Sequence, residues 1–206
     1  MIRAKKSLGQ NFLIDEKILN LIVGLGNINS NDIVLEVGPG TGNLTEKILK
    51  KGPKKIIVVE KDANLSMNLK KKFNKDIMVI NDDILNYNQS YLYKKKIIIF
   101  GNLLYNISTQ ILISWIKINN LKNFCKKFIL MFQKEVADRI IAKFNTSNYG
   151  RLSIICNWKL NIKKICDIKP ESFSPKPKID SSLLFFYPKK SFIKINDPNN
   201  LEKVTR

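Results

Sequence analysis

The residues that could carry chemistry stand directly after apolar runs, in the stretches EVGPGTG, VVEKD, NDDIL and GNLLYN. The first stretch places Gly38, Gly40 and Gly42 in a G-x-G-x-G turn that leads into a predicted helix. Glycines let the backbone approach a ligand closely, and a helix N-terminus offers free N–H groups. A dinucleotide site more usually has the spacing G-x-G-x-x-G. Because Glu36 adds an acid beside the turn, a cationic or zwitterionic ligand suits it better than pyrophosphate; a turn without any ligand is the alternative.

Two further carboxylates end the next two apolar runs. Glu60 stands twenty-two residues after Gly38, where an acid can accept hydrogen bonds from both hydroxyls of a ribose. Asp83 ends the third run and could accept a hydrogen bond from an adenine amino group. Either acid alone could be a solvated residue at a strand end. Together with the glycine turn they indicate a nucleoside pocket without a phosphate cradle, which fits S-adenosylmethionine.

The fourth stretch, GNLLYN, places Asn102 and Tyr105 at the mouth of the apolar run KIIIF. In an open α/β sheet, ligands bind outside the carboxyl ends of the strands. We therefore expect these two side chains to face a ligand.

Histidine is absent, which excludes Ser-His-Asp and Cys-His nucleophile systems and HExxH metal sites. The three cysteines, Cys125, Cys156 and Cys166, have no C-x-x-C spacing, which argues against a zinc site and a disulfide framework. We expect buried thiols and no metal. Any chemistry must then use amides, carboxylates, aromatic rings or a cofactor.

The elements that would position these residues alternate between strand and helix along most of the chain. Unbroken apolar strands separated by helices are typical of a mostly parallel sheet covered on both faces, so we predict a doubly wound α/β fold. The predicted strands are residues 33–37, 56–60, 77–80, 96–100, 128–132, 153–157 and 183–187. The predicted helices are residues 15–28, 43–51, 63–73, 108–118 and 133–144. The proline-rich residues 167–180 are predicted to be an ordered loop or a linker.

With 206 residues, 44% of them hydrophobic, the chain can bury one core. No apolar run approaches the roughly 20 residues that a membrane helix needs, and the Lys-rich N-terminus has no apolar signal core. We therefore expect a cytoplasmic protein without a membrane association.

The charge is strongly basic, with 36 Lys and Arg against 17 Asp and Glu and a formal net charge of +19. This charge indicates a polyanionic partner, with nucleic acid considered first. Only four of the basic residues are arginine, a pattern that favours attraction to phosphates over readout of base edges. Coding-composition bias toward lysine is the alternative explanation.

Five stretches resemble one family in order along residues 5–182: KKSLGQNFL, NLLYNIS, FQKEVADR, YGRLS and FSPKPKIDSS. With EVGPGTG, VVEKD and NDDIL, they make the chain similar to the ribosomal RNA adenine dimethyltransferase family of S-adenosylmethionine-dependent enzymes. The resemblance implies a Rossmann-like α/β fold with a mostly parallel, seven-stranded sheet and helices on both faces. Residues 1–188 would form the methyltransferase domain, with residues 1–13 as a basic arm over the cofactor.

The sequence departs from the family pattern at two places. Leu104 stands where the family motif has proline. Family members continue into a small helical C-terminal domain, and residues 189–206 would be a short polar remnant of it.

The resemblance also implies a role for particular residues. The cofactor would be bound by Asn11, Leu13, Gly38, Gly40, Glu60, Asp83 and Asn102. The reaction would be carried by Asn102, Leu103, Tyr105 and Phe173. Asn102 and the Leu103 carbonyl would orient the target amine, and the two aromatic rings would enclose the target base. The alternatives are a helix cap for Asn102, packing at the rim for Tyr105, and a core anchor of the proline-rich loop for Phe173.

The implied function is the transfer of methyl groups from S-adenosylmethionine to N6 of adjacent adenosines in small-subunit ribosomal RNA during ribosome biogenesis. The implied partner is a particle of the pre-30S type, bound by a monomer. Two alternatives are a resistance-type enzyme that methylates large-subunit ribosomal RNA, and a non-catalytic RNA-binding assembly factor.

Overall fold

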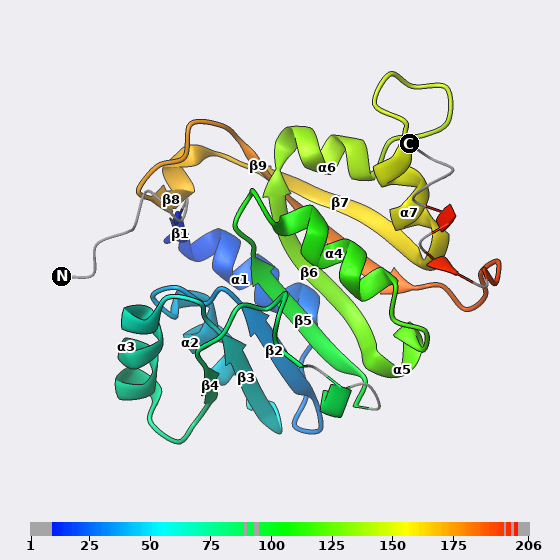
Figure 1. Cartoon of the computed structure of the whole chain (residues 1–206). Coiled ribbons are helices and arrows are strands. Elements are labelled where there is room, and N and C mark those ends of the chain that lie inside the picture. Colours follow the sequence, from blue (N-terminus) through cyan, green and yellow to red (C-terminus); the bar gives the residue numbers. More distant parts are fainter. Residues whose placement is uncertain (1–9, 89, 93–94, 196, 199, 202–206) are drawn as a thin grey trace.

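A seven-stranded sheet forms the centre of the computed structural model, which describes residues 10–88, 90–92, 95–195, 197–198 and 200–201. The strands lie in the order β4-β3-β2-β5-β6-β9-β7 (Figure 1). The first five run parallel, β9 is antiparallel to β6, and β7 is antiparallel to β9, so that only β9 runs in the opposite direction. The sheet consists of β2 (Ile33–Val37), β3 (Lys55–Val59), β4 (Met78–Ile80), β5 (Ile97–Asn102), β6 (Cys125–Gln133), β7 (Leu160–Ile168) and β9 (Ser181–Pro188). The predicted fold class is confirmed.

Helices cover both faces of the sheet, and each face has its own apolar core. One core lies between helices α4, α5, α6 and α7 and one face of the sheet. The other lies between helices α1, α2 and α3 and the opposite face (Figure 1). Alternate residues of the central strands serve the two cores, as the two-residue period of a strand requires. The helices are α1 (Glu16–Gly26), α2 (Asn43–Leu49), α3 (Ala63–Phe73), α4 (Ser108–Ile116), α5 (Leu121–Phe124), α6 (Lys134–Ile140) and α7 (Arg151–Lys159), with 3-10 turns at Ser90–Leu92 and Pro170–Ser172.

The strand predicted at residues 153–157 is wrong, because these residues lie within helix α7. A short apolar run cannot by itself distinguish a strand from a buried helix. The helical period appears only when the window is widened. Leu152, Ile155 and Cys156 pack in the core at i, i+3 and i+4 spacing, and Lys159 at i+7 is also buried.

The seventh strand of the sheet is instead β7, which the sequence analysis did not predict. Its sequence, LNIKKICDI, is interrupted by Lys163 and Lys164. Because β7 pairs only with β9 and lies at the edge of the sheet, it can carry charged side chains that a central strand would exclude.

A second, two-stranded sheet was also not predicted. It pairs β1 (Phe12–Leu13) with β8 (Phe173–Ser174) in antiparallel orientation. Of the proline-rich residues 167–180, the first two end β7, and those outside β8 otherwise form a loop that leads into β9, as predicted. The small sheet therefore attaches the N-terminal segment to this loop. No helix among the described residues is long and apolar enough to cross a membrane.

Candidate active site

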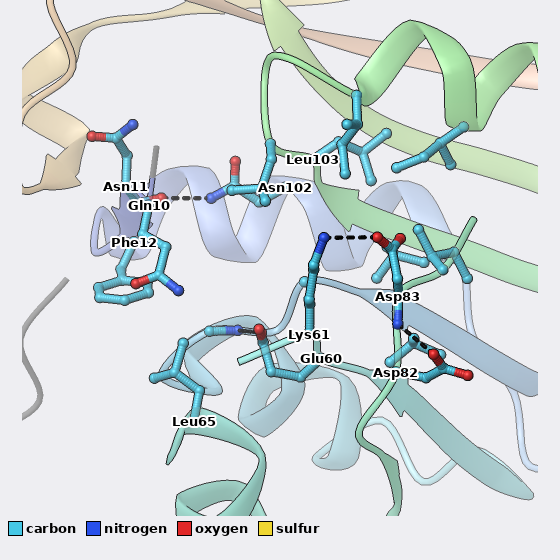
Figure 2. A pocket seen from close by; sticks show the side chains of 18 residues that line it. Gln10, Asn11, Phe12, Glu60, Lys61, Leu65, Asp82, Asp83, Asn102 and Leu103 are labelled. Atoms are coloured by element: carbon cyan, nitrogen blue, oxygen red, sulfur yellow. Dashed lines mark hydrogen bonds and ion pairs between the residues drawn. The ribbon is translucent and has the colours of Figure 1, made fainter. Parts of the chain in front are cut away.

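A cavity lies at the carboxyl ends of β2, β3 and β5, roofed by the segment around β1 (Figure 2). This is the edge at which parallel α/β sheets bind ligands. Its lining residues are Gln10, Asn11, Phe12, Val37, Gly38, Gly40, Val59, Glu60, Lys61, Leu65, Asp82, Asp83, Ile84, Asn102, Leu103, Leu104, Ile107 and Ile111. The predicted glycines, carboxylates and amide therefore come together in one place.

The loop after β2 has a backbone shape that requires glycine. Gly38 and Gly40 have φ angles of 67° and 57°, in the left-handed region that side chains disfavour. A Cβ atom on Gly40 would lie 2.7 Å from the ring of Phe12, so the phenyl group packs directly on the loop. The loop backbone is thus held close to the cavity on one side and to β1 on the other.

Glu60 is 6% exposed and fixes the glycine loop. Its Oε2 atom accepts a hydrogen bond from the Gly40 N–H at 3.1 Å, and its Oε1 atom accepts one from the Asp62 N–H at 2.9 Å. Burial raises the pKa of this carboxyl group above its usual value, although these hydrogen bonds oppose the shift. Each carboxylate oxygen can accept two hydrogen bonds, so Glu60 can still bind ligand hydroxyls.

Glu36 is 2% exposed and points toward α2, where it accepts a hydrogen bond from Thr45 Oγ1 at 2.7 Å. Burial raises its pKa to about 7, and the nearby Glu60 carboxylate adds to the shift. It lines a small recess that shares Gly38 and Asn102 with the main cavity. A carboxyl group in this position can lose its proton and become negatively charged when a cation enters the recess.

Asp83 is paired with Lys61, a residue that the sequence analysis did not include in the site. The Lys61 Nζ atom lies 2.8 Å from Asp83 Oδ2 (Figure 2). Through this hydrogen bond, Lys61 lowers the pKa of Asp83. Lys61 directly follows Glu60 in VVEKD, so its place at the same sheet edge could have been inferred from the sequence.

The side chain of Asn102 is oriented by the N-terminal segment. Its Nδ2 atom donates a hydrogen bond to the Asn11 carbonyl at 2.8 Å (Figure 2). No described residue donates to its Oδ1 atom, which remains available as an acceptor beside the cavity. Leu103, which follows it, is buried and also lines the cavity.

Tyr105 is half-buried and lies outside the set of lining residues. Its hydroxyl group is 2.7 Å from the Oγ atom of the buried Ser181, the first residue of β9. Burial raises the pKa of Tyr105. The hydrogen bond fixes the direction of the ring from a strand far away in sequence.

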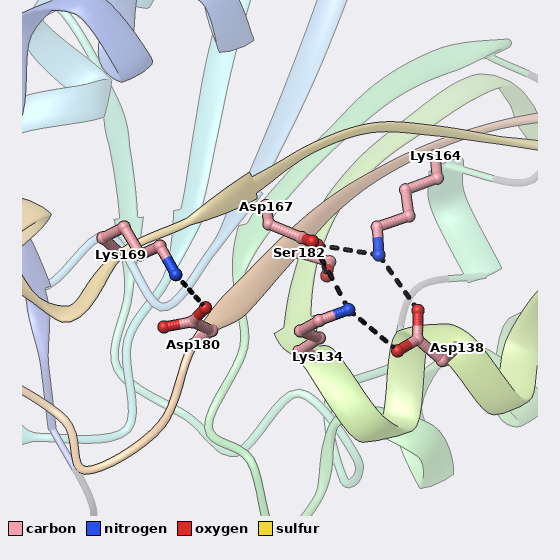
Figure 3. A network of polar contacts seen from close by, with 7 residues as sticks. All are labelled: Lys134, Asp138, Lys164, Asp167, Lys169, Asp180 and Ser182. Carbon is pink, nitrogen blue, oxygen red and sulfur yellow. Dashed lines mark hydrogen bonds and ion pairs between the residues drawn. The ribbon is translucent and has the colours of Figure 1, made fainter.

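The start of β9 is itself held by a network of ion pairs between α6 and β7 (Figure 3). Ser182 Oγ donates to Asp167 at 2.5 Å, and Asp167 pairs with Lys164 at 2.7 Å. Asp138 on α6 accepts from Lys164 at 2.9 Å and from Lys134 at 3.1 Å. The strand that carries the partner of Tyr105 is thus braced on both sides.

The structure does not bring Phe173 to the cavity. Its ring is 2% exposed and packs in the core beneath the small β1–β8 sheet. Among the two roles considered for this residue, the arrangement matches the core anchor of the proline-rich loop. Leu13 is buried in the same core, lines the small recess, and accepts a hydrogen bond from Asn43 Nδ2 through its carbonyl at 2.8 Å.

Gln10 and Phe12 complete the cavity without having been predicted. Both belong to QNFL, in which the family resemblance points only to Asn11 and Leu13. Because β1 is a strand, alternate residues point to opposite sides, and Phe12 reaches the cavity while Leu13 enters the core. Among the described residues, no group of three His, Cys, Asp or Glu side chains could hold a metal ion.

Comparison with known proteins identifies the family. The model of the family "Ribosomal RNA adenine dimethylase" matches residues 1–206, the whole chain. The chain belongs to this family. A ribosomal RNA small subunit methyltransferase A from Pelagibacter ubique (strain HTCC1062) is 61% identical over 206 residues, which cover all of this chain and 78% of that protein. The protein of the same name from Ehrlichia ruminantium (strain Gardel) is 43% identical over 89% of this chain and 70% of its own length.

The fold of the chain is also similar to that of solved RNA methyltransferase structures. A dimethyladenosine transferase from Plasmodium falciparum superposes with a TM-score of 0.78 at 33% identity, covering 87% of this chain and 64% of that chain. The chain thus spans less than two thirds of that protein. The 23S rRNA methyltransferase ErmE has a TM-score of 0.74 at 23% identity over 94% of this chain and 76% of its own, which supports the fold alone.

As a ribosomal RNA adenine dimethylase, the chain is an enzyme of the S-adenosylmethionine-dependent class. The cavity fits this cofactor on the chemistry of its groups: buried carboxylates beside a glycine loop accept hydrogen bonds, and Glu36 lies where a cationic group would be neutralised. The predictions of family, fold class, enzyme class and cofactor are confirmed. The roles of individual residues and the domain boundary at residue 188 stay predictions.

Proposed function

We propose that this chain transfers methyl groups to N6 of adjacent adenosines in small-subunit ribosomal RNA, acting in the cytoplasm as a monomer on a particle of the pre-30S type. The name of the relative that is 61% identical supports the choice of the small subunit. The observation that carries the mechanism is the orientation of Asn102, whose amide is fixed by the Asn11 carbonyl with its oxygen left free.

The residues that would hold the cofactor line the cavity and its recess at the ends of neighbouring strands. Asp83 would accept from the adenine amino group, and Glu60 would accept from the ribose hydroxyls. Gly38 and Gly40 would allow close backbone contact, as their left-handed conformations support. Glu36 would face the cationic end of the methionine portion. Bound there, S-adenosylmethionine supplies a methyl group activated by its sulfonium charge.

The target amine is a weak nucleophile, because its lone pair is delocalised into the adenine ring. Hydrogen bonds to Asn102 Oδ1 and to the Leu103 carbonyl would draw the nitrogen toward tetrahedral geometry and aim its lone pair into the cavity. Positioning of this kind can supply up to ~7–11 kcal/mol of the barrier. The proton released by the amine can pass to water, so no histidine is needed.

The base must leave the RNA stack to reach this position, as it does in other base-modifying enzymes. Tyr105 would stack on the extruded base, an interaction worth ~1–3 kcal/mol. Its hydrogen bond to Ser181 supports this role, since a ring of fixed direction loses less entropy when the base arrives. Phe173, buried in the core, would support the opposite wall of the site through β1 and β8 instead of touching the base.

Replacing Asn102 by alanine tests the mechanism. The Asn102→Ala variant should fold and bind RNA, and kcat should fall at least about 100-fold because the amine is no longer oriented. The matched control is Asn106→Ala, which removes an exposed asparagine from the same turn. Methyl transfer is measured with labelled cofactor and unmodified small subunits. Full activity of the Asn102→Ala variant would rule out the mechanism.

Leu104 supports a second candidate function, that of an RNA-binding assembly factor without turnover. It stands at the position of the family's proline and lines the cavity beside Asn102. Without the proline ring the backbone of the turn is freer, an effect of about 0.4–1 kcal/mol on stability. Calorimetry with S-adenosylmethionine distinguishes the two functions, because a pure binding module need not bind the cofactor. Label found on large-subunit RNA would instead indicate the resistance-type activity.

A further inference from the structure

The edge of the sheet opposite the cavity carries a concentration of lysines. Strands β2 to β6 are parallel, so the segments that lead into them all meet at the edge where these strands begin. We call the exposed lysines on these segments the lysine edge. They are Lys51, Lys54, Lys55, Lys70, Lys71, Lys75, Lys95, Lys96 and Lys122.

None of these lysines forms an ion pair with a described residue. Three acids of this region do not neutralise the lysine edge. Asp32 is paired with Lys126, Glu46 is paired with two other lysines, and Asp76 is exposed. The lysines in the last turn of α3 interact favourably with the negative end of the helix dipole, and this alone can explain why they stand there. That reason does not extend to the loops before β3, β5 and β6.

Several lysines at the cavity edge form ion pairs with acids. Lys61 is paired with Asp83, Lys134 with Asp138 and Lys169 with Asp180, the last two shown in Figure 3. The accumulation at one edge indicates a surface suited to a polyanion.

A hollow of about 380 Å³ continues the lysine edge beside α5. The chain after β9 reaches it because Pro188 pairs with Leu160 at this end of the sheet. Lysines, asparagine amides and the partly buried ring of Phe192 line the hollow together. Ammonium groups bind phosphates, amides bind sugars and base edges, and a ring can stack on a base, so the lining suits nucleic acid better than a lipid surface.

We propose that the lysine edge binds a second segment of the RNA substrate through its phosphates, apart from the segment that carries the target adenosine. The two surfaces are separated by the length of the parallel strands, since six residues of β5 span about 20 Å. The proposal rests on the proposed function for the identity of the RNA. Its mechanism is the release of counterions, which adds affinity without sequence readout.

Salt-dependent RNA binding tests the proposal with two double variants of equal charge. Lys54→Ala with Lys71→Ala removes two lysines of the edge; Lys17→Ala with Lys163→Ala removes two exposed lysines elsewhere. Binding to small-subunit ribosomal RNA is measured at several salt concentrations by filter retention. We expect the slope of log K against log salt to decrease in magnitude by about 1.5 for the edge variant and to stay unchanged for the control.

An unchanged slope in the edge variant, or an equal change in both variants, would overturn the proposal. Loss of binding to phosphatidylserine vesicles with intact RNA binding would overturn it as well, in favour of a membrane surface. Far-UV circular dichroism and urea unfolding check that each variant is folded, independently of cofactor binding. Because the readout is binding, the result holds even if no methyl transfer is detected, so this proposal and the proposed function can fail separately.

Discussion

The placement of the Asn102 and Glu36 side chains depends on contacts with other segments of the chain. The amide of Asn102 is directed by the carbonyl of Asn11, which lies 91 positions earlier in the chain. Glu36 is held by Thr45 and closed off from water. The sequence places both residues at strand ends, but neither the Asn11 contact nor the pairing of Lys61 with Asp83 follows from spacing, since each depends on how separate loops meet.

The buried carboxyl group of Glu36 should make stability depend on pH. Its pKa is about 7 in the folded chain against the ordinary value of 4.5, so between these pH values the folded state keeps a proton that the unfolded state has lost. Stability therefore falls as pH rises through this window. Relative to Glu36→Gln, the wild type should lose roughly 3 kcal/mol of unfolding free energy between pH 4.5 and pH 8. Urea unfolding of the cofactor-free proteins measures this; a difference that does not vary with pH would contradict it.

Elements were predictable where a single segment determines its own structure. The central strands are unbroken apolar runs, and α3 was predicted at residues 63–73, its observed bounds. Prediction failed where the secondary structure of a segment depends on the other segments that it contacts. The run at residues 153–157 is helical because its neighbours complete a helical face, and β7 tolerates lysines as an edge strand. The two residues of β1 form a strand only through pairing with β8.

The small β1–β8 sheet gives a test at this scale. Phe173→Ala should lower the free energy of unfolding by about 3–5 kcal/mol, because it empties a fully buried site in the core. Phe173→Leu should cost less, since it leaves a smaller cavity. Chemical denaturation measures both variants. If Phe173→Ala instead changed stability by less than 0.5 kcal/mol while raising KM for RNA, the ring would be a base-stacking residue and not a core anchor.

At the scale of the whole molecule, the sheet separates two surfaces for which we propose different roles. The cavity edge orients the groups of the proposed chemistry, and the opposite edge carries nine exposed lysines that form no ion pair with a described residue. The net charge of +19 predicted a polyanionic partner, but its distribution could not be read before the parallel strands placed distant loops side by side. Composition alone therefore indicated the class of partner, but not which surface of the protein would bind it.

The central claim is that this chain methylates adjacent adenosines of small-subunit ribosomal RNA at N6. The most direct measurement incubates the wild-type protein with methyl-labelled S-adenosylmethionine and unmodified small ribosomal subunits, and then maps the label along the RNA. We predict dimethylated N6 positions on neighbouring adenosines of the small-subunit RNA, with no label when Asn102→Ala replaces the wild type. Label confined to large-subunit RNA, or no label from a wild-type protein that binds the cofactor, would contradict the account.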